Sequence, residues 1–279
     1  MKREIKKSVF GRPTIDGAGV HLVRVLGNET TRDYDPFLML DAFDSEDPRD
    51  YIEGFPMHPH RGIETVSYLM KGSMEHSDNL GNKGVIGNGE SQWMTAGSGI
   101  IHQEMPIASD YLLGLQLWIN LPKDDKMTHP AYFGITKDMI QVVEEETATV
   151  KVISGNFRGV QGVEPKFVQA TMLDVKVKPG KFFTMDTNPA ENLFIYVVEG
   201  EGYVSKKVAE KKSAVLFTKG DEFSIEASSD GLHFVLCSGK PLNEPIAWSG
   251  PIVMNTREEI NTASRELRNG TFVKADAMK

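Results

Sequence analysis

Short runs of β-branched, aromatic and aliphatic residues, separated by turn residues, recur along most of this 279-residue chain. Residues 113–120 form the clearest run, because leucine or isoleucine alternates there with glycine, glutamine, tryptophan and asparagine. A period of two is the pattern of a strand with one face buried. Glycine-rich turns stand at short spacing, as at 81–84 and 87–89. Many short strands joined by such turns predict an all-β sandwich or barrel.

The strand-and-turn pattern stops between residues 123 and 165, where a polar loop and a charged turn stand. It returns from residue 166, with strands expected at 167–172, 173–177 and 194–198 and with turns expected at 200–202, 219–221 and 228–231. We therefore expect two domains, residues 1–135 and 136–279.

One helix is expected near the C-terminus. Thr256 to Glu259 match a capping box, Ile260, Ala263 and Leu267 follow at helical spacing, and Gly270 can end the helix. Its apolar stripe must pack on a sheet, and the first domain is a candidate.

Composition narrows the class of protein. A formal net charge of −8 argues against direct binding of nucleic acid, which needs a concentrated basic surface. The charged residues 1–7 argue against a signal peptide or membrane span. Cys237 is the only cysteine, so no intramolecular disulfide can form, and a reducing compartment, the cytoplasm, is expected.

Two short segments concentrate ionisable side chains. Residues two apart in a strand face the same side, so His58 projects with His60, and His102 projects with Glu104. If both segments line one barrel, three imidazoles and a carboxylate converge, which suits a divalent transition metal. Glu64 shares the inward parity, so either Glu64 or Glu104 is the carboxylate ligand, and the other orients a ligand or acts as a general base.

The competing interpretation is that these histidines only complete hydrogen-bond networks. It is the better interpretation for a lone histidine such as His233, whereas two same-face pairs in one short stretch favour a metal. His76 is a candidate for a pocket mouth, and Arg61 is expected to pair with a loop acid.

The spacing His-x-His-x-x-x-Glu at 58–64, followed by Gly-x-x-His at 99–102, is similar to the two-part signature of the cupin superfamily. The wording of residues 58–69 and 92–106 resembles the pirin family of bicupins. This resemblance implies two tandem cupin domains, jelly-roll-like β-barrels: a metal-binding one over 1–135 and a metal-free one over 136–279 that carries the C-terminal helix. It also implies four metal ligands, namely His58, His60, His102 and Glu104, with Glu64 as a neighbour.

The resemblance further implies a metal-dependent dioxygenase that cleaves flavonols such as quercetin, a quercetin 2,3-dioxygenase activity. The expected cofactor is one Fe(II) per chain, with Mn, Ni, Cu and Zn as alternatives, and the expected catalytic base is Glu104 or Glu64. The partners are then a flavonol-like substrate and O₂, without nucleic acid or membrane. A single chain is expected to be the functional form, because a bicupin pairs two barrels within one chain. The alternative is a non-enzymatic iron- or redox-sensing protein that binds transcription factors or metabolic enzymes; a cupin isomerase or sugar-binding enzyme fits the motif wording less well.

Overall fold

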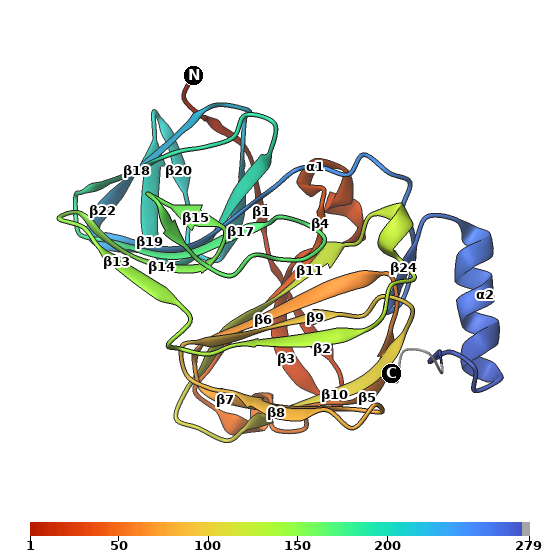
Figure 1. The fold of residues 1–279 in the computed structure, drawn as a ribbon. Coiled ribbons are helices and arrows are strands. Elements are labelled where there is room, and N and C mark those ends of the chain that lie inside the picture. The colour runs from red at the N-terminus through yellow and green to blue at the C-terminus, as the bar shows by residue number, and fades with distance from the viewer. Residues whose placement is uncertain (275–279) are drawn as a thin grey trace. The chain divides into compact units, whose positions relative to one another are not determined.

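A computed structural model describes residues 1–274 of the chain, and β-strands dominate it (Figure 1). The chain packs into two compact units whose segments interleave along the sequence. The first, here the histidine unit, contains residues 13–28 and 37–136 and the chain from residue 242 onward. The second, here the phenylalanine unit, contains residues 1–12, 29–36 and 137–241. Each unit thus includes a segment from the far end of the sequence, and the linear division at residues 135 and 136 stays a prediction.

Two antiparallel sheets build most of the histidine unit. A four-stranded sheet has the order β5-β10-β7-β8, and a seven-stranded sheet has the order β12-β9-β6-β11-β4-β3-β2. The bounds of their strands are β2 Arg12–Asp16, β3 Val20–Leu26, β4 Phe37–Ser45, β5 Phe55–His60, β6 Ile63–Lys71, β7 Ser73–Asp78, β8 Lys83–Ile86, β9 Glu90–Thr95, β10 Ile100–Ile107, β11 Leu112–Asn120 and β12 Ala131–Ile135. Two sheets of this kind are the architecture that the strand-and-turn pattern predicts.

Strand β11 confirms the alternating run, but the expectation of one buried face is wrong. The polar parity is also buried, with Gln116, Trp118 and Asn120 all 9% exposed or less. These side chains have partners inside the unit, because Gln116 and Asn120 form hydrogen bonds there and Trp118 packs on an imidazole. Alternation of polarity therefore marks two buried environments of different chemistry in this strand.

The C-terminal helix confirms the capping signal. Helix α2, Arg257–Arg268, begins after Thr256, whose hydroxyl accepts a hydrogen bond from the Glu259 N–H, while the Glu259 carboxylate accepts from the Thr256 N–H. Its apolar side packs with the small hairpin of β23, Ala247–Ser249, and β24, Ile252–Met254, in one cluster that includes Ile260, Ala263 and Phe272. The helix therefore belongs to the histidine unit, as Figure 1 shows for α2 beside β24.

A nine-stranded antiparallel sheet dominates the phenylalanine unit. Its elements, with a separate two-stranded ribbon of β15 and β16 and the short helix α1, have the bounds β1 Ile5–Phe10, α1 Thr31–Tyr34, β13 Gln141–Glu144, β14 Ala148–Ser154, β15 Asn156–Phe157, β16 Val160–Gln161, β17 Thr171–Val177, β18 Phe182–Asp186, β19 Asn192–Val204, β20 Lys207–Ala209, β21 Ser213–Phe217 and β22 Glu222–Gly239. Its core is a large cluster rich in phenylalanine, including Phe157, Phe183, Phe223 and Phe234.

Three local expectations in this unit are wrong. Residues 200–202 and 228–231 lie inside the long strands β19 and β22, where irregular pairing absorbs the glycines without reversing the chain. The separate strands expected at 167–172 and 173–177 are a single strand, β17, which begins only at Thr171, so residues 167–170 are not strand.

No helix within residues 1–274 has the length and apolar character needed to cross a membrane.

Candidate metal centre

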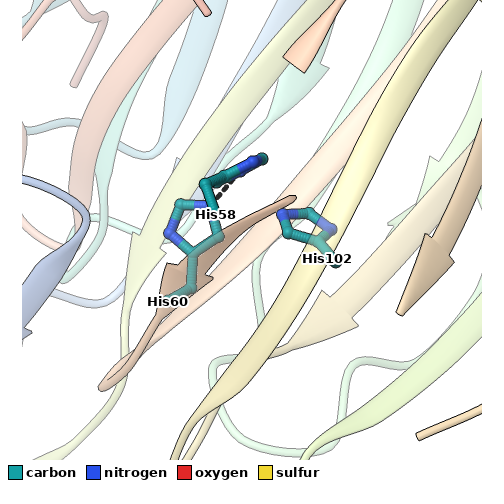
Figure 2. A group of neighbouring side chains, drawn as sticks. All are labelled: His58, His60 and His102. Carbon is teal, nitrogen blue, oxygen red and sulfur yellow. Dashed lines mark hydrogen bonds between the residues drawn. The ribbon is translucent and has the colours of Figure 1, made fainter. Parts of the chain in front are cut away.

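Three histidines meet on the four-stranded sheet of the histidine unit. In the antiparallel pairing of β5 with β10, His102 lies directly opposite His58, and His60 lies two residues further along β5. One ring nitrogen of each histidine lies within 4.8 Å of those of the other two. Figure 2 shows the three imidazoles facing one another from the two strands. The same-face argument from the sequence therefore holds for all three.

Backbone carbonyls orient two of the rings. His58 Nδ1 lies 2.9 Å from the Pro56 carbonyl oxygen, and His60 Nδ1 lies 3.1 Å from the Pro251 carbonyl oxygen. Because a carbonyl only accepts, each Nδ1 is the protonated nitrogen, and each Nε2 keeps a lone pair. The two Nε2 atoms lie 3.0 Å apart. Two nitrogens about 2.1 Å from one ion and at right angles around it would lie about 3.0 Å apart, so this pair fits a shared metal.

His102 supplies the strongest sign that the cluster is built for a ligand. Its side chain is 1% exposed, yet neither ring nitrogen has a hydrogen-bond partner. A buried polar atom without a partner costs about 1–3 kcal/mol, so such atoms are rare in native folds. A metal ion bound to one of these nitrogens would remove part of that cost, which none of the described side chains does.

Burial keeps the inner rings neutral. Loss of solvent, followed by the neighbouring imidazoles, lowers the pKa of His60 well below its ordinary value. The same two causes, burial and the nearby His58 and His76, lower the pKa of His102 in the same way. Neutral imidazole is the form that coordinates a metal.

Glu104 is buried in the same unit and held by the opposite sheet. Its carboxylate accepts hydrogen bonds from Gln116 Nε2 at 2.8 and 2.9 Å and from the Ser67 hydroxyl at 3.1 Å. The cluster of mutually close ligand atoms found among residues 1–274 contains the three histidines and no carboxylate. The role of Glu104 as fourth ligand stays a prediction.

Glu64 occupies a different hydrogen-bond environment. It lies on β6, is 1% exposed, and accepts a hydrogen bond of 2.7 Å from the Thr95 hydroxyl on β9. Burial raises the pKa of Glu64 to about 7, although the Thr95 bond acts in the opposite direction. A carboxyl group with this pKa takes up and releases a proton near neutral pH, the property required of a general acid or base. Its catalytic role stays a prediction.

The polar parity of β11 supplies two residues that sequence reasoning missed. Gln116 holds Glu104, and the Trp118 ring lies edge-on to the His60 imidazole, with 4.9 Å between ring centroids. The available signal is the alternation of Gln, Trp and Asn with aliphatic residues, a pattern that predicts a solvent-facing side for the polar residues. Glutamine and tryptophan on a buried strand face would instead have indicated a site.

The remaining sequence candidates fall outside the cluster. His76 lines a cavity of about 190 Å³ together with Gln92 and Tyr132, and its ring stacks on Tyr132 at 5.3 Å. His233 lies in the phenylalanine unit, where Nε2 is 2.6 Å from an Asp174 carboxylate oxygen. Arg61 does form an ion pair, but its partner Glu266 lies on helix α2 and not in a loop.

Fold and site together define a two-unit β protein of the cupin type with a candidate metal centre in one unit. The profile described as "Pirin" matches residues 19–119, and the profile described as "Pirin C-terminal cupin domain" matches residues 172–273. A pirin-like protein of Caulobacter vibrioides is 43% identical over 97% of this chain and 99% of its own, and human pirin is 39% identical over 96% and 93%. The chain therefore belongs to the pirin family.

Solved structures support the same fold. A protein named quercetin 2,3-dioxygenase from Acinetobacter baumannii superposes with a TM-score of 0.89 at 30% identity, over 98% of this chain and 99% of that one. A bacterial pirin from Escherichia coli, solved in complex with nickel(II), superposes with a TM-score of 0.63 at 22% identity, over 84% and 98%. The second likeness, at this identity, supports the fold alone.

Proposed function

We propose that the chain is a metal-dependent dioxygenase of the pirin type. The observation that carries the proposal is the cluster of His58, His60 and His102, with two carbonyl-oriented rings and a third whose buried nitrogens lack partners. A purely structural histidine cluster would satisfy these nitrogens within the protein. Nitrogen ligands of this kind suit Fe(II), our first candidate, and also Mn(II), Ni(II), Cu(II) and Zn(II).

The three imidazoles would hold the ion, with Glu104 as the proposed fourth ligand. When bound, the ion supplies Lewis acidity and a fixed orientation for an oxygen-bearing substrate. Gln116 and Ser67 hold the Glu104 carboxylate by hydrogen bonds to its oxygens, so they limit its rotation. Trp118 shields the His60 ring from water.

The proton acceptor is one of the two buried carboxylates. Glu64, with its pKa of about 7, takes a proton from a substrate hydroxyl at neutral pH if the hydroxyl reaches it. Glu104 serves instead if its bond to Gln116 yields to the substrate. The substrate class that we propose is a flavonol-like aromatic with O₂ as co-substrate, and its support is the name of the Acinetobacter relative at 30% identity.

The test combines metal content with oxygen uptake. Protein purified without chelators and loaded with Fe(II) is expected to hold about one metal per chain and to consume O₂ with quercetin. His58→Ala should lose both properties, whereas His233→Ala, a histidine in the other unit, should keep them. Failure of the wild-type protein to bind any metal after reconstitution would overturn the proposal. Metal binding without oxygen uptake would leave the redox-sensing alternative.

Two further variants separate the carboxylates. Glu104→Gln is expected to weaken metal binding, whereas Glu64→Gln should keep the metal and slow oxygen uptake. The reverse result would make Glu64 the ligand.

A further inference from the structure

The end of strand β5, which carries His58 and His60, is held by a segment almost 200 residues away in sequence. The Val253 N–H on β24 donates to the Arg61 carbonyl at 3.1 Å. The Lys126 ammonium donates to the carbonyls of Gly62 at 2.8 Å and Val253 at 3.0 Å. Gly62 has a φ of +77°, and a Cβ there would lie 2.0 Å from the Val253 oxygen, so only glycine permits this approach.

The same segment reaches the His60 ring directly through Pro251 and indirectly through Trp118. The Pro251 carbonyl accepts the Nδ1 proton, at 3.1 Å. Trp118, which packs edge-on to His60, stacks in turn on Trp248 with 5.8 Å between ring centroids. The hydrogen bond sets the tautomer of His60, and Trp118, supported by Trp248, limits the rotation of its ring.

Arg61 connects this arrangement to helix α2. Its side chain is 2% exposed, and one terminal nitrogen lies 2.7 Å from a Glu266 carboxylate oxygen and 2.7 Å from the Phe272 carbonyl oxygen. The guanidinium also lies 4.2 Å from the centre of the Phe272 ring. A buried cation is stable only while its partners stay in place, so the position of Arg61 depends on residues 266 and 272.

We propose that residues 248–272 form a clamp on the metal strand, and that Arg61 is a positioning residue that fixes the orientation of the adjacent His60. This inference rests on the proposed metal centre, in which His60 is a ligand. Through Arg61, the clamp keeps the Pro251 carbonyl beside Nδ1 and so directs the Nε2 lone pair toward His58 and His102. Partners that orient a ligand in this way typically contribute about 10–100-fold to metal affinity.

Two readouts test the clamp in the full-length protein. The first is the tautomer of His60 in metal-free protein, from long-range ¹H–¹⁵N spectra of histidine-labelled samples. The second is the dissociation constant for Ni(II), from competition with a chromogenic chelator. The variants are Glu266→Ala, which removes the ion pair with Arg61 together with the one to Lys274, and Phe272→Leu, which keeps most of the side-chain volume but removes the ring. Glu258→Ala, an exposed acid on the same helix, is the matched control.

Wild-type protein and the control should show His60 protonated at Nδ1 alone. Both clamp variants should show a mixture of tautomers and bind Ni(II) about 10-fold or more weakly. Glu266→Asp restores the charge and should recover part of the Ni(II) affinity. If Glu266→Ala weakened binding for a merely structural reason, Glu266→Asp and Glu266→Ala would bind Ni(II) equally weakly. Folded variants with the wild-type tautomer and affinity would overturn the clamp. If wild-type protein binds no Ni(II), the metal centre fails, while the tautomer measurement still decides whether the clamp orients His60.

Discussion

The interiors of the two units differ in chemistry although antiparallel strands build both. In the histidine unit, imidazoles and the hydrogen-bonded Glu104 occupy space where a barrel usually has aliphatic side chains. In the phenylalanine unit, aromatic rings fill the same kind of space. The centroid of the Phe183 ring lies 5.7 Å from the ring centroids of both Phe157 and Phe234. The interior of the phenylalanine unit is closely packed with apolar side chains, whereas that of the histidine unit combines apolar clusters with a candidate metal centre. Aromatic packing and the candidate site therefore lie in separate parts of one chain.

The two units also differ in how a largely shielded histidine is paired. His233 lies 2.6 Å from Asp174, so its Nε2 is satisfied within the protein. His102 is more completely buried, at 1% exposure, yet neither of its nitrogens has a partner among the described residues. The difference distinguishes a histidine with a partner within the protein from one that is buried with its nitrogens open, as expected of a metal ligand.

The largest effect on stability is expected from the aromatic interior. Phe234→Ala removes a fully buried ring that packs on Phe183 and Phe223, and such a truncation costs about 3–5 kcal/mol. Urea unfolding should show the loss, and metal content per folded chain should stay unchanged. A loss of metal in folded Phe234→Ala protein would contradict the separation of roles between the two units.

A pH-dependent effect is expected from the histidine unit. The pKa of Glu64 is about 7 in the folded protein, above the ordinary value of 4.5, so the folded state holds this proton more tightly. The stabilisation is complete below pH 4.5 and is lost as the pH rises through about 7, and it amounts to about 3 kcal/mol. Glu64→Gln keeps a polar group for Thr95 but cannot ionise. Urea unfolding of metal-free protein should therefore show a flatter pH profile for the variant, with its largest gain over wild type at pH 8; equal slopes would show that Glu64 titrates normally.

The smallest effects come from one substitution made in each unit, and they should have opposite signs. His102→Leu removes two unpartnered nitrogens and should stabilise metal-free protein by about 1–3 kcal/mol. His233→Leu leaves the buried Asp174 with a weaker set of partners and should destabilise by a similar amount. Thermal unfolding of both variants, without metal, measures the two changes in stability. If both variants changed the free energy of unfolding in the same direction, the distinction between unpartnered and partnered histidines would fail.

Much of the fold follows from local patterns in the sequence. Alternation at residues 113–120 predicts β11, and the signals from Thr256 to Glu259 predict the start of α2, because both patterns depend on neighbours within a few residues. The glycines at 200–202 and 228–231 wrongly predict turns, because β-bulges and turns both favour glycine. The interleaving of the two units has no local signal, because it depends on contacts between distant segments.

The residues of the candidate site also differ in how far the sequence predicts them. His58, His60 and His102 were predictable because strand geometry alone places the first two on one face, and two same-face pairs in one stretch are unusual. The sequence does not predict the roles of Pro251, Trp248 and Phe272, because they lie in a segment that carries no candidate ligand of its own. Sequence motifs indicate candidate ligands, whereas the residues that orient them are identified only from the three-dimensional structure.

The interleaved segments have a consequence for synthesis. Domains generally fold as they leave the ribosome, starting from the N-terminus. Residues 58–104 are made well before the Pro251 carbonyl and before Glu266 and Phe272, the partners of Arg61. His58 has its orienting Pro56 carbonyl as soon as it is made, whereas His60 lacks its own until residue 251 has been added. If the proposed metal centre forms, an oriented His60 is expected to be available for a metal only once residues 248–272 have been made.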